Sequence, residues 1–74
     1  MQPSYKKLWI LLAHKEISKA QLRKDLKMAS STLTKLNKNE VVSLSLLLKI
    51  CDYLKCDIGD IMEVQHIDNN DTDE

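Results

Sequence analysis

Residues 19–36 read KAQLRKDLKMASSTLTKL and contain two apolar patterns of helical spacing. Leu22 and Leu26 are four residues apart, and Leu33 and Leu36 are three apart, so each pair lies on one face of a helix. Only four residues, without glycine or proline, separate the two patterns. A join this short keeps the helices from lying antiparallel. It predicts that they cross at about 90–120°, which is the helix-turn-helix arrangement.

Helical spacing predicts three more helices around this pair, so the sequence indicates an all-α fold of five short helices. A first helix is expected over residues 5–14, with Ser4 as its N-cap. A fourth, over residues 44–54, is apolar on more than one face, which predicts a central position in the core. A fifth, very short helix is expected over residues 58–62.

The formal net charge of zero hides two regions of opposite sign. The last eight residues, IDNNDTDE, carry four acids and no base, and without them eleven basic residues stand against seven acidic ones. Six of the basic residues lie between Lys19 and Lys38, where Asp25 is the single acid. We predict one domain over residues 1–66 and a disordered acidic tail at 67–74, because the tail has too few apolar residues to fold. The basic stretch coincides with the helix pair and favours an anionic partner.

No catalytic or cofactor-binding pattern is present, so we expect a protein that is not an enzyme and has no cofactor. Cys51 and Cys56 lie among apolar residues and are expected to be reduced core thiols. Zinc would need four ligands, and His14 and His66 form no recognisable ligand spacing. The longest apolar run, residues 8–13, is far shorter than the ~20 residues of a membrane span. We expect a cytoplasmic protein with no membrane association and no small-molecule substrate.

Five segments, in their order and with their loop lengths, resemble a known family over about Tyr5 to Val64. The most specific segments are SSTLTKL and SLSLLLKICDYLKCDIGDIME. The chain resembles the phage-repressor and Cro-type helix-turn-helix regulators, also called the xenobiotic-response-element family. It is most similar to the minimal single-domain bacterial members. The resemblance implies a lambda-repressor-like fold, with residues 19–26 as the supporting helix and residues 30–36 as the recognition helix.

The sequence departs from the family where the family usually has glycine. Lys27 stands at the turn between the two central helices, Glu16 before the second helix, and Asn37 and Asn39 in the loop after the third. Arg23 takes the place of a small residue, and its stem is expected to lie along the helix junction with its head in solvent. Lys tolerates a left-handed backbone at some cost, so we expect a strained or shifted turn at Lys27.

The resemblance implies that the recognition helix enters the major groove of double-stranded DNA, which admits one α-helix. The predicted base contacts are the side chains free to point outward: Ser30, Ser31, Thr34 and Lys35. Hydroxyls both donate and accept, so they read several bases weakly, and Lys35 can donate to guanine or to phosphate. The predicted phosphate contacts flank the helix pair: Ser18, Lys19, Arg23, Lys24, Lys27, Asn37, Lys38 and Asn39.

These residues predict a sequence-specific, DNA-binding transcriptional regulator, most simply a repressor. Useful affinity would come from a homodimer on a two-fold site, with half-sites about one helical turn apart. The predicted dimer interface consists of apolar residues near the end of the chain: Ile58, Ile61, Met62, Val64 and Ile67. The alternative is an antitoxin-like or coactivator-like module on the same fold that binds a protein partner. The weak base-reading set and the acidic tail favour that alternative.

Overall fold

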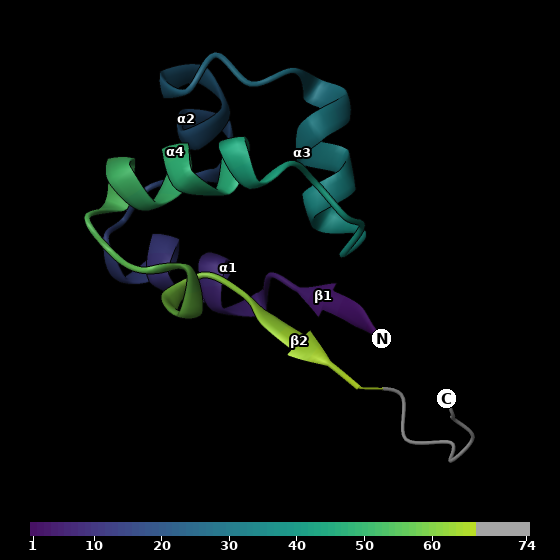
Figure 1. The fold of residues 1–74 in the computed structure, drawn as a ribbon. Coiled ribbons are helices and arrows are strands. Elements are labelled where there is room, and N and C mark those ends of the chain that lie inside the picture. The colour runs from purple at the N-terminus through teal and green to yellow at the C-terminus, as the bar shows by residue number, and fades with distance from the viewer. Residues whose placement is uncertain (67–74) are drawn as a thin grey trace.

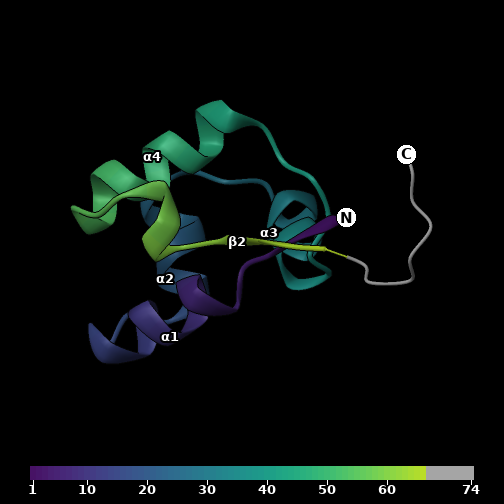
Figure 2. The ribbon, with the colours of Figure 1, turned by 60° about the horizontal axis from the view of Figure 1, so that its bottom comes forward.

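The computed structural model describes residues 1–66, so the tail predicted at 67–74, including Ile67, lies outside the described residues. The elements are β1 (Gln2–Ser4), α1 (Lys6–His14), α2 (Lys19–Asp25), α3 (Ser30–Asn37), α4 (Leu44–Leu54), the 3-10 turn η1 (Ile58–Asp60) and β2 (Glu63–Gln65). Figures 1 and 2 show α2 and α3 joined by a short turn, with the start of β1 and the end of β2 close together. Across residues 1–66, no helix is long and apolar enough to cross a bilayer.

Serine side chains cap the N-termini of two of the four α-helices in the described residues. Ser18 Oγ accepts a hydrogen bond of 3.0 Å from a backbone N–H in the first turn of α2, and Ser43 Oγ accepts one of 3.1 Å at the start of α4. Each satisfies an amide that has no partner within its helix. The N-cap predicted at Ser4 is wrong, because Ser4 lies in β1 and the N-cap of α1 is Tyr5.

Lys27 adopts a left-handed backbone at the turn between α2 and α3, with φ of 53°. Immediately after it, the N–H of Met28 donates to the C=O of Arg23 at 2.9 Å and closes the turn. A residue with a Cβ is strained in this conformation by about 1–2 kcal/mol. Of the two outcomes expected at Lys27, the structure has the strained turn. The other left-handed residues are Glu16, Asn39 and Lys55, with φ of 58°, 57° and 56°.

One apolar cluster, with contributions from every α-helix, forms the core. Its buried members are Tyr5, Leu8, Leu12, Leu22, Met28, Leu36, Leu47, Ile50, Cys51, Leu54 and Ile61. Four of them belong to α4, which confirms the central position predicted for that helix. Cys56 packs against the edge of the cluster, and both it and Cys51 are free thiols.

The fifth helix predicted over residues 58–62 is wrong, because the chain forms only a three-residue 3-10 turn there. Asp57 and Asp60 form a capping box around this turn, with the N–H of Asp57 donating to Asp60 Oδ2 at 3.0 Å. The chain then extends, and β2 pairs antiparallel with β1, with Ser4 opposite Glu63. Over residues 1–66 the fold is therefore four α-helices and a two-stranded sheet, and not five helices.

Ile61 is enclosed by this arrangement and has an exposed fraction of 0%. Ile61 therefore packs within its own protomer, and its assignment to a dimer interface stays a prediction. Ile58 and Met62 are half-buried against the core, whereas Val64 is 50% exposed.

Candidate nucleic-acid interface

The outer side of α3 carries the four predicted base contacts. Leu36 is buried and Leu33 is half-buried on the inner side, so helical spacing turns the polar positions outward. The residues on the outer side are all exposed: Ser30, Ser31, Thr34 and Lys35. The Thr34 hydroxyl donates to the C=O of Ser30 at 3.0 Å, which leaves its lone pairs and its methyl group for a partner. This reading edge can donate, accept and contact a thymine methyl.

The start of α3 is not capped by a side chain. Its N-cap is Ala29, which has no side-chain hydrogen bond, whereas Ser18 and Ser43 cap α2 and α4. The first N–H groups of α3 are therefore free of a side-chain acceptor, and the helix dipole adds partial positive charge at this end. In helix-turn-helix docking this end of the recognition helix approaches the base edges.

Lys19, at the first position of α2, contacts both neighbouring helices. Its Nζ lies 4.1 Å from the centre of the Trp9 ring on α1 and donates to Asn37 Oδ1 on α3 at 2.8 Å. The cation–π contact and the hydrogen bond tie α2 to the first and third helices. Lys19 and Asn37 therefore serve the fold in addition to any role they have at phosphates.

Asp25, the single acid of the helix pair, bonds to side chains of α2 and α4. Gln21 Nε2 donates to one carboxylate oxygen at 2.6 Å, and the Tyr53 hydroxyl donates to the other. The hydrogen bond to Asp25 raises the pKa of Tyr53 because it stabilises the protonated phenol, and desolvation and the charge of Asp25 act in the same direction. Both oxygens of the carboxylate therefore have intramolecular donors.

Arg23 spans the tight turn between α2 and α3. Its Nη1 donates to the C=O of Met28 at 3.3 Å. The head, which was predicted to lie in solvent, therefore bonds to the backbone of the turn. A single bond leaves most of the guanidinium donors available to a phosphate.

The loop after α3 is hydrogen-bonded to Tyr5, the N-cap of α1. Asn39 Oδ1 accepts a hydrogen bond of 3.0 Å from the N–H of Tyr5, and the Tyr5 hydroxyl donates to the C=O of Glu40 at 2.8 Å. Burial raises the pKa of Tyr5. Asn39 thus uses its amide oxygen within the fold, while Lys38, the C-cap of α3, is exposed.

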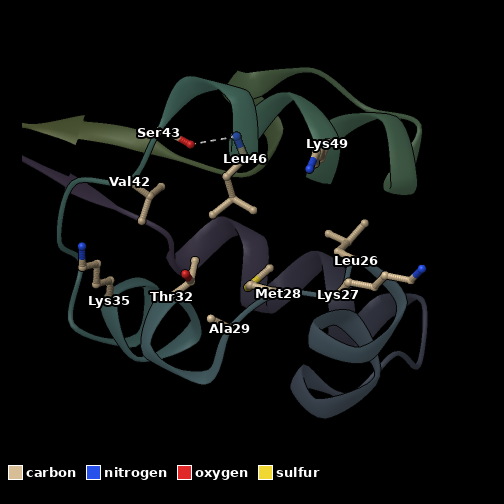
Figure 3. Close-up of a pocket in the computed structure, with 10 residues that line it drawn as sticks. All are labelled: Leu26, Lys27, Met28, Ala29, Thr32, Lys35, Val42, Ser43, Leu46 and Lys49. Atoms are coloured by element: carbon tan, nitrogen blue, oxygen red, sulfur yellow. Dashed lines mark hydrogen bonds between the residues drawn. The ribbon is translucent and has the colours of Figure 1, made fainter.

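A groove of about 390 Å³ lies between α4 and the segment formed by the turn and α3 (Figure 3). Its lining residues are Leu26, Lys27, Met28, Ala29, Thr32, Lys35, Val42, Ser43, Leu46 and Lys49. Lys27, Lys35 and Lys49 are exposed, and we call this hollow the lysine groove. Lys49 was not among the residues predicted from the sequence. Lys49 follows Leu46 by three residues, and both line the groove. That spacing puts the two side chains on one helix face and is the sequence signal that could have located Lys49.

The predicted phosphate contacts divide into two groups in the structure. Five of them already make intramolecular hydrogen bonds: Ser18, Lys19, Arg23, Asn37 and Asn39. Three are exposed lysines: Lys24, Lys27 and Lys38. Within residues 1–66 the ion pairs join Lys7 to Glu63 and Lys55 to Asp52, so no described carboxylate pairs with those three lysines.

Residues 7–66 match the family model of the Cro/C1-type helix-turn-helix DNA-binding domain. The chain belongs to this family. A solved structure that is similar to this Cro/C1-type chain is the crystal structure of the transcriptional regulator VanUg, form II. The two share 52% sequence identity with a TM-score of 0.82, over 84% of this chain and 83% of that chain. Among curated proteins, none matches this chain. The predicted family resemblance is confirmed.

Membership of the Cro/C1-type family identifies α2 and α3 as the helix-turn-helix unit of a DNA-binding domain. Lys27, in place of glycine, does not change the course of that unit, because its backbone takes the left-handed conformation. The family assignment supports DNA as the partner of this domain.

Proposed function

We propose that this Cro/C1-type domain is a sequence-specific transcriptional regulator that represses by occupying double-stranded DNA. The observation that carries the proposal is the reading edge of α3, whose serines and lysine are exposed and whose helix start has no side-chain cap. Such a helix fits the major groove and presents donors and acceptors to base edges. A domain bound in this way keeps other proteins from binding the same stretch of DNA. Because its partner is DNA, we expect the protein to act in the cytoplasm.

Each predicted contact has a role in this proposal. Ser30, Ser31, Thr34 and Lys35 read base edges, while the flanking residues hold the phosphates on either side. The exposed lysines, Lys24, Lys27 and Lys38, supply most of the salt-dependent affinity because they are free to release counterions from DNA. Lys19 and Arg23 chiefly hold α2 and the turn in place, and they contact phosphate with the donors that remain.

The proposal includes a homodimer formed beside the strand pair. An apolar hollow of about 270 Å³ lies there, lined by Met1, Gln2, Pro3, Tyr5, Val41, Val42, Leu47, Met62 and Val64. Met1, Val41 and Val64 are 76%, 77% and 50% exposed, which is more apolar surface than a free edge requires. Within the described residues β1 and β2 have only each other as partners, so their outer edges offer backbone groups to a second copy.

Sedimentation equilibrium of the wild type and of Val41→Lys tests the dimer. The wild type is expected to self-associate, and the lysine should shift it to monomer because a charge would be buried at the interface. Ile10→Lys is the matched control, since Ile10 is an exposed apolar residue of α1 outside this hollow. A wild type that stays monomeric at high concentration, alone and with DNA, would exclude the dimer.

Selection from a pool of random duplexes tests sequence-specific binding. The wild type should enrich a defined sequence, and Lys35→Ala should change the preferred base at one or two positions, with a loss of about tenfold in affinity for the wild-type site. Lys6→Ala is the control, because it removes one exposed charge from α1 and leaves α3 intact. No enrichment, together with no binding to any duplex at low salt, would favour the protein-interaction module.

A further inference from the structure

We propose that the lysine groove binds a backbone phosphate of double-stranded DNA, with Lys49 of α4 as a phosphate contact outside the helix-turn-helix. The proposal rests on the proposed function and extends it. Three lysines from three segments line the groove: Lys27 from the turn, Lys35 from α3 and Lys49 from α4. They line one groove only in the folded chain, because Lys27 and Lys49 are far apart in sequence.

The groove has a strongly one-sided charge. No acidic residue lines it, and none of its lysines takes part in an ion pair within residues 1–66. Ser43 lines the same groove and caps α4, whose first turn contains no acid, so the positive end of the helix dipole adds to the charge of the lysines. Positive side chains on both sides of a groove that has no acidic residue in its lining favour an anion.

The position of the groove points to DNA as the source of this anion. Lys35 belongs both to the groove and to the outer side of α3, so the groove is continuous with the reading edge. DNA that places its bases against Ser30 and Ser31 would carry its backbone past Lys35 toward α4. Figure 3 shows Leu46 and Lys49 on α4 across the groove from Thr32 and Ala29.

The salt dependence of binding tests the role of Lys49 and requires no knowledge of the operator. Affinity for a fluorescent random-sequence duplex is measured by anisotropy from low to moderate potassium chloride, for the wild type and for Lys49→Ala. Each phosphate contact contributes about 0.9 to the slope of log affinity against log salt. Lys49→Ala is therefore expected to make that negative slope less steep by about 0.9, and Lys49→Arg is expected to restore the wild-type slope. Circular dichroism of each variant checks that it folds, which is expected because Lys49 is an exposed helix position.

Lys15→Ala is the matched control, because Lys15 is an exposed lysine at the end of α1 that does not line the groove. The inference is overturned if the wild type binds with a steep slope and Lys49→Ala changes it no more than Lys15→Ala. Amide chemical shifts give a second readout, since the amide resonances of residues 43–49 should shift when duplex is added. Shifts confined to α3 would overturn the inference while leaving the proposed function intact. A wild type without salt-dependent binding would overturn both.

Discussion

Helices α2 and α3 are similar in length and in polar composition, but their side chains are used differently. Those of α2 bond within the protein: Lys19 to Trp9 and Asn37, Gln21 to Asp25, Asp25 to Tyr53, and Arg23 to the backbone of Met28. The four outer side chains of α3 remain exposed, and among them Thr34 bonds only to its own helix. Asn37, at the end of α3, accepts the bond from Lys19. The supporting helix is therefore marked by internal contacts of its polar side chains, and the reading edge of α3 is marked by their absence.

This difference predicts which substitutions disturb folding and which disturb DNA binding. A change on α2 should lower stability and affect DNA binding through the position of α3. A change on the exposed side of α3 should leave stability almost untouched, because surface substitutions without partners have effects within about 0.5 kcal/mol. The two helices should nevertheless be equal in one respect, since each buries a leucine completely.

The largest effect is expected where the two helices are alike. Leu22 and Leu36 are both 0% exposed, so Leu22→Ala and Leu36→Ala should each lower the free energy of unfolding by about 2–5 kcal/mol. Urea denaturation followed by Trp9 fluorescence and by circular dichroism measures the loss. A leucine whose truncation changed stability by less than 1 kcal/mol would show that its helix does not pack on the common core.

The next largest effect separates the helices. Lys19→Met keeps the stem but removes the cation–π contact and the hydrogen bond to Asn37, so it should lower stability by about 1 kcal/mol. Lys35→Met on α3 should change it by less than about 0.5 kcal/mol. The same urea titrations compare the two variants. Equal effects would contradict the division between a bonded α2 and a free α3.

A smaller effect of opposite sign is expected at the turn that joins the helices. Lys27→Gly should raise stability by about 0.5–1 kcal/mol, because the relief of left-handed strain exceeds the extra freedom of glycine in the unfolded chain. Lys24→Gly, within α2, should instead lower stability by about 1 kcal/mol. Thermal melts of both variants check the two signs. A loss at Lys27 would mean that its side chain contributes more than its backbone costs.

The smallest effect concerns pH and the contact between α2 and α4. The pKa of the Tyr53 hydroxyl is higher in the folded protein than in the unfolded chain. The protonated hydroxyl therefore stabilises the fold at a pH below the unfolded-state pKa, and this stabilisation is lost as the pH rises through the folded-state pKa. The wild type should therefore lose stability relative to Tyr53→Phe above about pH 10. The comparison cancels the titration of Tyr5, which both proteins share. A constant difference from neutral to alkaline pH would contradict the bond to Asp25.

Local sequence patterns were sufficient for the four α-helices and for the helix-turn-helix. Leucine spacing predicted a helix over residues 44–54, and α4 is observed at Leu44–Leu54. The left-handed backbone at Lys27 was foreseeable because the family has glycine there. These features depend on neighbours in the chain, which is why a pattern can predict them.

Features that depend on distant neighbours were not foreseeable. The three-residue strand β1 has no periodicity of its own, and it forms because Glu63–Gln65 comes alongside. The segment at Ile58 and Ile61 has helical spacing but is too short to form more than one turn after the capping box. Lys49 lines the same groove as Lys27 and Lys35 only because α4 packs across the turn. The contacts of Lys19 also become visible only when three helices are in place.

The strand pair has a consequence for how the protein is made. Gln2 is opposite Gln65, so β1 obtains its partner only after the four helices between the two strands have been synthesised. The helices make mostly local contacts and can form early, whereas this pairing closes nearly the whole chain and is entropically expensive. We therefore expect nascent chains shorter than residue 65 to hold the helix-turn-helix without the sheet.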